Sequence, residues 1–369
     1  MVGESYCVIS FTAYIWRTAI AVLFFYAVFC AVCSFLLNLF LCLFAGVVQQ
    51  VEIIVGNMHK LLFWILWGSM WLVSLLPRKV FYILSDVCAF FLNMFGYRRS
   101  VIDVNMARSF PKMHYGHLKK LRKRYYQYMM DLALESIWAI SASQKQICEV
   151  VSVPDREMMN ELCSRHPKVV IVVGHVGNWE LFGGVCGPQG ADVTGGFAAS
   201  NLYLSYKRAK NKAFDDFFVK MRMLAFKKAG NQGHILESKH ILRHILKDRK
   251  STGLYIFIAD QSPKEERVVT KFLNQPTLFL AGAEYVASKL GIPMVYMGID
   301  RVARGKYEIN FKLLEENTKG VPHGELTRRF ASCLEEDIFA NNVNWLWSHK
   351  RWKRDFRSEE IEEYKKLYE

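Results

Sequence analysis

The feature that most constrains this chain is a long stretch near its amino terminus, from Thr18 to Val51, that carries no charged side chain. An α-helix needs roughly 20 mainly apolar residues to cross a bilayer. The stretch therefore predicts a transmembrane helix over Ala19–Val48, with length to spare for tilt. A cleaved signal peptide is the alternative, but its apolar core spans only about 7–15 residues. The greater length of this stretch favours a retained anchor.

Two shorter apolar stretches follow. Leu61–Pro77 carries three tryptophans, and Val80–Phe95 carries Asp86 as its one charged residue. Tryptophan is enriched at the membrane–water interface. We expect two interfacial or shallowly inserted helices over Leu61–Phe95, broken near Pro77.

The sequence then divides into three parts. Residues 1–57 form a hydrophobic segment with the expected transmembrane helix, residues 58–110 form membrane-anchoring helices, and residues 111–369 form an α/β domain. Met58 is an alternative start, because every stretch of functional character follows it. Residues 58–369 are therefore expected to suffice for activity and membrane attachment.

The charge balance limits the kind of partner. Lys and Arg number 48 against 34 Asp and Glu, which gives a net charge of +14, while 52% of the residues are hydrophobic. The apolar content excludes a disordered chain, and the basic charge suits an anionic lipid surface or a nucleic acid. Nucleic-acid binding would favour aromatic stacking platforms on a soluble domain. The membrane segments argue against it, so we expect membrane lipid and no nucleic acid as a partner.

The nine cysteines show no metal or disulfide pattern. Cys30 and Cys33 form a C-x-x-C pair, a spacing also found in redox proteins. They lie within the apolar stretch and have no βαβ pattern around them, which favours apolar packing in a membrane helix. We therefore expect no metal and place the α/β domain in a reducing, cytoplasmic environment.

The rest of the chain alternates between strand-like and helix-like segments. Continuous apolar runs predict strands over Lys168–Gly174, Asp192–Ala199, Ser251–Ala259 and Pro293–Asp300, with Tyr307–Leu313 as an antiparallel edge strand. Helical periodicity and stop signals predict helices over His117–Ala142, Ser205–Met223, Glu237–Leu246, Leu278–Leu290 and Gly324–Asn341. This alternation predicts an α/β fold with a mixed, mostly parallel sheet flanked by helices.

The most informative residues directly follow the first of these strands and read Gly174-His175-Val176-Gly177-Asn178-Trp179-Glu180. His175 stands at the carboxyl end of a strand, where α/β sheets bind ligands. Glu180 stands near the start of the next helix, where the dipole favours negative charge. A carboxylate on one ring nitrogen leaves the other free to take a proton from an alcohol. The spacing thus predicts a His175–Glu180 dyad for acyl transfer without an enzyme nucleophile.

The alternative interpretation is structural, with His175 entering a helix and Glu180 as an ordinary acid in its first turn. The strand–turn–helix setting favours the dyad. The sequence has no Gly-x-Ser-x-Gly motif, which argues against a serine hydrolase. A Walker loop and a dinucleotide-binding glycine fingerprint are also absent from it.

These residues give the chain a resemblance to a known family. His175–Leu181 is similar to the signature block of the bacterial lipid A late acyltransferases, the lauroyl/myristoyl transferases, within the lysophospholipid acyltransferase-like superfamily. Other stretches similar to family blocks are Leu76-Pro77, Arg98-Arg99, Asn105–Pro111, Tyr206–Asp215, Ala259–Gln261 and Trp345–Lys353. Where the family has Phe-Phe-Gly, this chain has Phe272-Leu273-Asn274, which leaves the shape of that loop open.

The resemblance implies a glycerolipid acyltransferase-like fold and a membrane-bound O-acyltransferase that uses no cofactor. Such enzymes move a fatty acyl chain from acyl-carrier protein, less often from acyl-CoA, to a hydroxyl of a phosphorylated glycolipid, the lipid A precursor. The implied location is the bacterial inner membrane, with the catalytic domain on its cytoplasmic face.

The resemblance also implies roles for individual residues. His175 is the general base and Glu180 orients it. Arg222 is a candidate for holding the oxyanion or a substrate phosphate. Asn178 is expected to bind substrate. Two further candidates, Asp260 and Gln261, would either orient substrate or cap the structure.

Basic residues concentrate in Arg98–Arg124, Lys207–Lys250 and Lys350–Arg357. They suit an acidic carrier protein and a phosphorylated lipid, or they are solvated faces near anionic lipid. Two further hypotheses stay open. One is the same chemistry on an aminolipid, phospholipid or glycolipid acceptor, and the other is a non-catalytic membrane-bound interaction protein.

Overall fold

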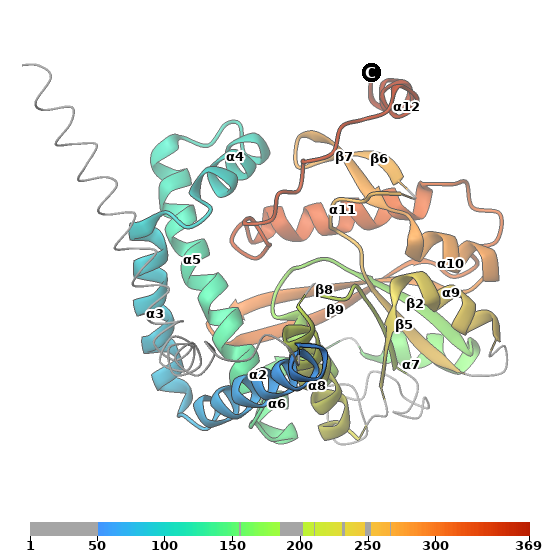
Figure 1. The fold of residues 1–369 in the computed structure, drawn as a ribbon. Helices are drawn as coiled ribbons and strands as arrows, with labels where there is room; N and C mark the ends of the chain where they lie inside the picture. The colour runs from blue at the N-terminus through green and yellow to red at the C-terminus, as the bar shows by residue number, and fades with distance from the viewer. Residues whose placement is uncertain are drawn as a thin grey trace, which may run out of the picture.

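The structure is a computed structural model that describes residues 51–154, 156–184, 202–209, 211–230, 233–247, 252–265 and 267–369. The predicted transmembrane helix over Ala19–Val48 and the predicted strand over Asp192–Ala199 lie outside these residues. Figure 1 shows an α/β body with a group of helices, α2 to α5, packed along one side.

A seven-stranded sheet forms the centre of the molecule, in the order β1-β9-β8-β2-β5-β3-β4. β2 pairs in parallel with both β5 and β8, whereas β8 and β9 pair antiparallel. The sheet is therefore mixed and mostly parallel, which confirms the predicted α/β fold with such a sheet. Its strands are β1 (Val151–Ser152), β2 (Lys168–Val173), β3 (Leu202–Tyr206), β4 (His234–Glu237), β5 (Gly253–Ile258), β8 (Met294–Ala303) and β9 (Lys306–Glu315).

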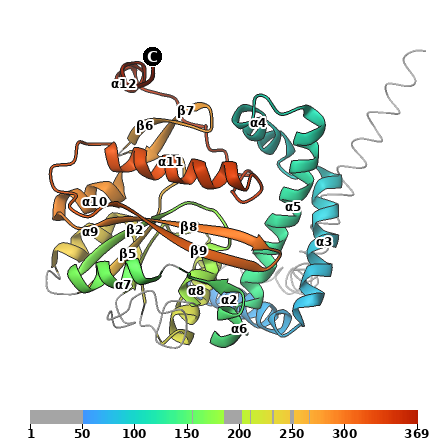
Figure 2. The ribbon, with the colours of Figure 1, turned by 180° about the vertical axis from the view of Figure 1, so that it is seen from behind.

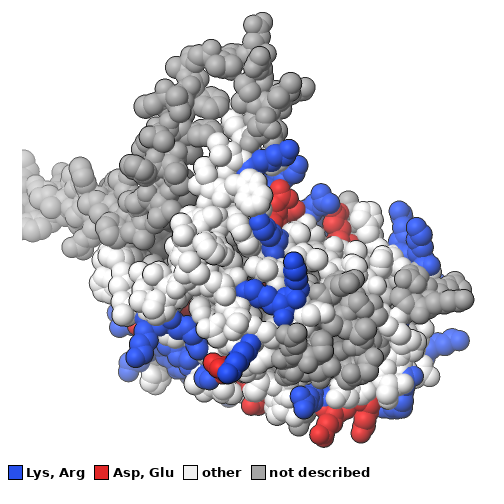
Figure 3. Space-filling view, turned by 90° about the horizontal axis from the view of Figure 1, so that it is seen from below, with Lys and Arg blue, Asp and Glu red and all other residues white. Residues whose placement is uncertain are grey.

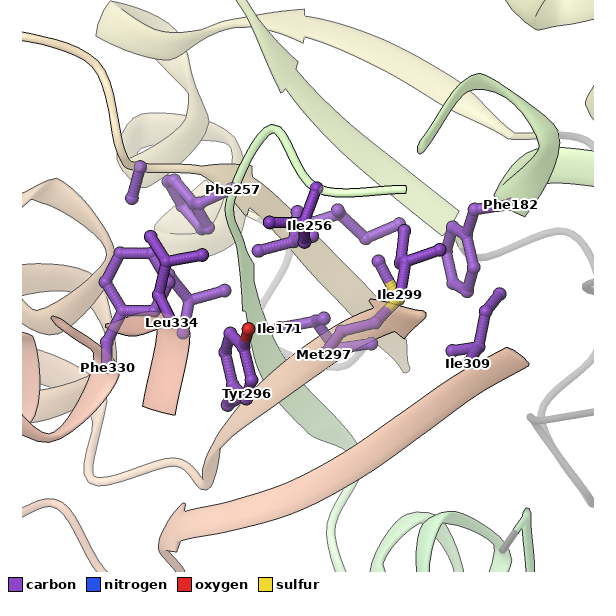
Figure 4. Packing of buried hydrophobic residues seen from close by; sticks show 14 of the residues in the cluster. Ile171, Phe182, Ile256, Phe257, Tyr296, Met297, Ile299, Ile309, Phe330 and Leu334 are labelled. Carbon is purple, nitrogen blue, oxygen red and sulfur yellow. The ribbon is translucent and has the colours of Figure 1, made fainter. Parts of the chain in front are cut away.

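The sheet is buried on both faces. All six residues of β2 are buried, as expected for a strand of β-branched residues in the middle of a parallel sheet. Figure 4 shows Ile171, Ile256 and Met297 of neighbouring strands packed together, with Leu334 of α11 on one side and Phe182 on the other. This packing fixes the carboxyl end of β2, where His175 lies.

Helices cover the two faces of the sheet. In Figures 1 and 2, α10 (Gly282–Leu290) and α11 (Glu325–Ala340) lie on one side, and α7 (Arg156–Arg165) and α8 (Lys212–Lys228) lie on the other. Short elements fill the connections: α6 (Gln144–Cys148), the 3-10 helix η1 (Trp179–Gly184) and α9 (Ser238–Lys247).

A separate antiparallel hairpin lies beyond α11. It consists of β6 (Arg267–Phe272) and β7 (Gln275–Leu280). After α11 the chain runs past α4 (Arg99–Ser109) and this hairpin to the terminal helix α12 (Ser358–Tyr368), as both ribbon views show. The region where these segments meet contains the cleft described below.

The helices α2 (Val51–Ser74) and α3 (Arg78–Phe95) meet at Pro77, where the sequence predicts a break. Within the described residues no single helix is long and apolar enough to cross a membrane, but Met58–Ser74 and Arg78–Phe95 pass that test as a pair bent by 114°. Several large apolar side chains on this pair are exposed, among them Leu61, Trp64, Leu72, Leu75, Ile83 and Phe90. Membrane attachment through these helices stays a prediction.

The α2 helix also contacts the α/β body. Phe63 and Trp67 pack near Phe217 of α8, and the Lys220 ammonium lies 4.2 Å from the ring centroids of both Trp64 and Trp67. Figure 3 shows the molecule from below, with a broad uncharged area beside separate clusters of Lys and Arg. An apolar surface bordered by basic side chains is suited to anionic lipid.

Two predicted helix boundaries are wrong. The predicted helix over Ser205–Met223 begins with the end of β3, and α8 starts only at Lys212, where the Asn211 side chain accepts hydrogen bonds from two backbone N–H groups of the first turn. The predicted helix over Leu278–Leu290 begins inside β7, and α10 covers its second half. In the second stretch, the apolar residues Leu278–Leu280 of the strand lead directly into the helix. In the first, the basic segment between Tyr206 and Lys212 separates the strand from the helix, and the prediction wrongly included it in the helix.

Candidate active site

The turn after β2 is held by two glycines that leave no room for a side chain. A Cβ on Gly174 would lie 2.5 Å from Leu334 Cδ1, and one on Gly177 would lie 2.6 Å from the Ile299 carbonyl oxygen. Gly177 also has a φ of 57°, in the left-handed region that glycine tolerates best. The turn therefore packs directly against β8 and α11, and this fixes the position of His175.

A buried carboxylate binds the His175 ring. The Asp260 carboxylate lies 2.5 Å from His175 Nδ1 and also accepts the His175 backbone N–H at 2.9 Å. Since a carboxylate only accepts hydrogen bonds, Nδ1 carries the proton and Nε2 has a free lone pair. Asp260 is 3% exposed and His175 is 9% exposed.

Asp260 stays ionised despite its burial. Burial alone would raise the pKa of this carboxyl, but the electrostatic attraction of the His175 ring and hydrogen bonds from His175 and Trp345 outweigh it and lower the pKa to about 2. Trp345 Nε1 donates to Asp260 Oδ2 at 2.8 Å. An ionised carboxylate at Nδ1 stabilises the imidazolium that forms when Nε2 takes a proton.

The second ring nitrogen of His175, Nε2, lies beside the side-chain amide of Gln261. Gln261 Nε2 lies 3.2 Å from His175 Nε2 and donates to it. Gln261 is exposed, so its amide can be displaced by a substrate hydroxyl. Sequence analysis predicts substrate orientation or capping for Asp260 and Gln261, and the structure brings both into contact with His175.

The structure does not place Glu180 against the ring of His175, with which the sequence predicts that it pairs. The Glu180 carboxylate accepts two hydrogen bonds from Arg222, from Nε at 2.8 Å and from Nη2 at 2.5 Å, and a third from Trp179 Nε1. The reason is the short 3-10 helix, which directs Glu180 towards α8 while Asp260 occupies Nδ1 from the neighbouring strand. Trp179 stands between the two groups, with its ring edge on His175 at a centroid distance of 4.9 Å.

Arg222 is thus a partner of Glu180 on the rim of the site. Burial alone would lower the pKa of Arg222, but the hydrogen bonds and charge of Glu180 raise it above its ordinary value. The pair borders a cavity of about 30 Å³ whose other walls are mainly apolar, including Phe182, Leu204 and Met297. This cavity has room for about one or two water molecules, so an acyl chain would have to widen it.

Asn178, which is predicted to bind substrate, does not face open space in the structure. It is 3% exposed, and its Nδ2 donates to Glu135 Oε2 at 3.0 Å. Tyr307 and Tyr82 donate to the same carboxylate, and burial raises the pKa of Glu135 above its ordinary value. Asn178 therefore anchors the turn to α5 (Tyr115–Trp138) from within the protein.

The structure also gives a role to two stretches that resemble family blocks but whose function the sequence leaves open. Asn105 Nδ2 donates to the carbonyls of Trp347 and His349, both at 2.8 Å, and Arg98 Nη1 donates to the carbonyl of Ser348. These hydrogen bonds join an amino-terminal and a carboxyl-terminal block of the resemblance. They hold in place the segment from which Trp345 donates to Asp260.

Sequence reasoning missed Trp345 and Glu135 as supporting residues. The signal for Trp345 is the run of Trp, His and Arg after the last predicted helix, which is unusual for a solvated tail. The position of Asn274, which departs from the family pattern, is now clear. It has a φ of 60° in the two-residue β6–β7 turn, a conformation that Asn tolerates, and its Nδ2 donates to the Ser109 carbonyl.

Glu180→Gln tests whether the Glu180–Arg222 pair is structural. The change leaves the Arg222 guanidinium without its carboxylate, so we expect the free energy of unfolding to fall by about 2 kcal/mol, below the figure for a fully buried pair because this one is partly exposed. Thermal unfolding of the full chain in detergent measures it. Glu336→Gln, in the exposed pair with Lys312, is the matched control and should cost less than about 1 kcal/mol. Equal losses in the two variants would contradict the structural role.

Among the residues that the structure describes, no group of three or more His, Cys, Asp or Glu side chains is placed to hold a metal ion. The site brings together the His175 imidazole, the Asp260 carboxylate and the nearby donors Gln261 and Trp345. This set fits proton transfer from a hydroxyl and stabilisation of the charge that follows.

Comparison with known proteins gives the chain its family. No curated protein matches it. Among solved structures, the 1-acyl-sn-glycerophosphate (LPA) acyltransferase PlsC from Thermotoga maritima is similar at 13% identity, covering 73% of this chain and 100% of that one, with a TM-score of 0.30. The model of the family described as bacterial lipid A biosynthesis acyltransferase matches residues 53–354. The chain therefore belongs to the bacterial lipid A biosynthesis acyltransferase family, whose members are acyltransferases that act on lipids.

Proposed function

We propose that this protein transfers a fatty acyl chain from acyl-carrier protein to a hydroxyl of a phosphorylated lipid A precursor, with acyl-CoA as a poorer donor. The observation that carries the proposal is the geometry of His175, whose Nδ1 is bound by the buried, ionised Asp260 and whose Nε2 faces only the displaceable Gln261 among the described residues. Family membership supplies the lipid substrate class.

The proposed reaction needs a single base. The acceptor hydroxyl displaces Gln261 and gives its proton to His175 Nε2 while its oxygen attacks the thioester carbonyl carbon. Asp260 stabilises the imidazolium, and the carbonyl oxygen becomes an oxyanion. When the tetrahedral intermediate collapses, the C–S bond breaks and the thiolate takes the proton from His175. The ester and the free thiol leave, and the base is restored.

Arg222 is the candidate for stabilising negative charge in this scheme. Glu180 accepts from its Nε and Nη2, so Nη1 is the nitrogen left to meet an oxyanion. A fixed, charged donor at this position lowers the energy of the transition state more than that of the ground state. Trp179, which contacts both His175 and Glu180, places the apolar cavity next to the reacting carbonyl.

The proposed location is the cytoplasmic face of the bacterial inner membrane. The support for it is the exposed apolar surface of α2 and α3, with Lys and Arg clusters nearby, and the apolar stretch that precedes α2 in the sequence. The acceptor lipid would then approach from the bilayer and the acyl-carrier protein from the cytoplasm.

His175→Ala tests the proposal. With the full chain in detergent, acyl-carrier protein loaded with a fatty acid and a lipid A precursor, we expect kcat to fall by at least about 10³-fold, because alanine removes the nitrogen that is proposed to take the proton. Acyl transfer that persists within tenfold of the unmodified protein would rule out the assigned base.

Mass spectrometry of lipids from a deletion strain identifies the acceptor. Lipid A that lacks one acyl chain supports the proposal. Unchanged lipid A with an altered polar lipid contradicts the acceptor and favours the same chemistry on another lipid.

A further inference from the structure

A second cleft lies apart from the apolar cavity at Glu180 and shares no lining residue with it. Its volume is about 350 Å³. The polar residues that line it come from four separate parts of the chain: Arg108 from α4, Ser262 from the loop after β5, Gln275 from β7, and Arg351 and Arg354 from the segment after α11. Figures 1 and 2 show these elements side by side above the sheet.

Hydrogen-bond donors in this cleft have no partner. Within the described part of the chain, Ser262 Oγ, Gln275 Nε2, Arg351 Nε and Arg354 Nε are buried and make no hydrogen bond. A buried polar group without a partner costs roughly 1–3 kcal/mol, so native proteins rarely leave several together. Each of these four atoms can donate, which is the arrangement expected around an absent acceptor.

The charge of the cleft also favours an anionic ligand. Three of its lining residues are arginines and none is acidic. Among the residues described, Arg108, Arg351 and Arg354 form no ion pair with Asp or Glu. Arg351 is 2% exposed, donates from Nη2 to the Leu278 carbonyl at 2.6 Å and lies 4.6 Å from the Phe279 ring centroid.

Arg351 keeps its charge in this environment. Burial lowers the pKa of its guanidinium to about 10, which leaves it protonated at neutral pH. Asp260 attracts this charge only from beyond ion-pair distance. Because a buried charge is costly, an anion bound at contact distance would offset the cost that remains.

We propose that this cleft binds a phosphate group of one of the two substrates, an inference that rests on the proposed function for the identity of those substrates. Phosphate offers several acceptor oxygens and a negative charge, and guanidinium groups match it through paired N–H donors. The cleft presents three guanidinium groups together with the hydroxyl of Ser262 and the amide of Gln275.

The cleft is connected to the catalytic base by two short segments. Ser262 follows Asp260 and Gln261, which contact opposite nitrogens of His175. Arg351 belongs to the same segment as Trp345, which donates to Asp260. A phosphate held by these arginines is therefore linked directly to the groups that orient His175, so binding would position the substrate relative to Nε2.

Two substrate phosphates share this chemistry. One is a phosphate on the glycolipid acceptor, and the other is the phosphodiester of the phosphopantetheine arm of the acyl-carrier protein. The variants for testing are Arg354→Gln, at a half-buried position, and Arg108→Gln, at an exposed one, because neither change is expected to prevent folding. Lys319→Gln, an exposed change far from the cleft lining, is the charge-matched control.

The experiment compares substrates with and without the phosphate. With the full chain in detergent, kcat/KM is measured for phosphorylated and dephosphorylated acceptor, and for acyl-carrier protein and acyl-N-acetylcysteamine as donors. For whichever substrate uses the cleft, Arg354→Gln should lower kcat/KM about 10- to 100-fold when the phosphate is present and less than about threefold when it is absent. Arg108→Gln should act in the same direction, and Lys319→Gln should change neither value.

Equal effects of Arg354→Gln on the substrates with and without phosphate, for both acceptor and donor, would overturn the inference. Failure of the proposed function is distinguishable, because the unmodified protein would then acylate neither acceptor. In that case the probe is inorganic phosphate alone. If the cleft binds phosphate, added inorganic phosphate should raise the melting temperature of the unmodified protein and of the Lys319→Gln protein, but not that of the Arg354→Gln protein. Equal stabilisation of all three would overturn the inference.

Discussion

Asp260→Asn is expected to lower kcat by about 10²–10⁴-fold while leaving the KM for the acyl donor nearly unchanged. The asparagine amide has nearly the same shape, but it carries no charge to stabilise the imidazolium and can present N–H instead of oxygen to Nδ1. The ring then loses the tautomer that keeps Nε2 unprotonated. The measurement is steady-state acyl transfer with the acceptor saturating and the donor concentration varied through its KM.

Trp345→Phe is the control: it separates the loss of the Asp260 charge from a change in the residues that surround His175 and Asp260. It removes the N–H that donates to Asp260 Oδ2 but leaves the carboxylate, so kcat should fall by no more than about tenfold. An Asp260→Asn protein that is folded and retains kcat within threefold of the original would show that the carboxylate has only a structural role.

The effect of Asp260 on stability has a defined sign. Its pKa of about 2 in the folded protein lies below the ordinary value of 3.8. The ionised carboxylate therefore stabilises the fold above about pH 4, and this contribution is lost as the pH falls from about 4 towards 2. At neutral pH the group is fully ionised, so protonation of Asp260 does not limit activity there.

Gly177→Ala is expected to lower the free energy of unfolding by about 3 kcal/mol or more, since it combines backbone strain with a steric clash. The new Cβ would lie 2.3 Å from Ile299 Cγ2 and 2.6 Å from the Ile299 carbonyl oxygen, at a φ of 57°. Because the turn cannot move without moving His175, activity should be lost as well. For a chain of this length the melting temperature should fall by about 4 °C or more.

Two other glycines separate the causes. Gly320 has a φ of 81° but open space around an added Cβ, so Gly320→Ala measures strain alone and should cost about 1 kcal/mol. Gly68 lies inside α2 with nothing near an added Cβ, so Gly68→Ala should be neutral or stabilising. Losses of similar size for Gly177→Ala and Gly320→Ala would contradict the close packing of the turn against β8.

The position of the base can be predicted from the sequence because it depends on local pattern. The run of valines and isoleucine before Gly174 defines a buried strand, and the residues after such a strand face the ligand-binding edge of the sheet. The same reasoning places Asp260 and Gln261 at that edge. In the parallel register Val173 lies opposite Ile258, so His175 and Asp260 follow their strands by the same number of residues.

The partner of His175 could not be chosen from the sequence. Glu180 is five residues away and Asp260 is distant along the chain, so local spacing favours Glu180. The choice depends on β2 and β5 being neighbours in the sheet and on α8 presenting Arg222 to Glu180, and both are tertiary facts. The Glu180 carboxylate pairs with the neighbouring Arg222 guanidinium, and the Asp260 carboxylate binds the His175 imidazole.

The same limit applies to residues that act through contacts between distant segments. Asn178 lies three residues after His175, yet its side chain is directed inwards to Glu135 of α5. The cleft arginines come from α4 and from the segment after α11, and nothing local shows that Arg108 and Arg351 line one site. The basic character of both stretches is visible in the sequence, but their meeting point is not.

The central claim is that Asp260, and not Glu180, forms the catalytic dyad with His175. The most direct test is kcat for Asp260→Asn and Glu180→Gln, measured in one assay at saturating donor and acceptor and normalised to folded protein. The geometry predicts a loss of about 10²-fold or more for Asp260→Asn and a loss of less than about tenfold for Glu180→Gln. The reverse order, with Glu180→Gln nearly inactive and Asp260→Asn nearly unimpaired, would contradict the claim.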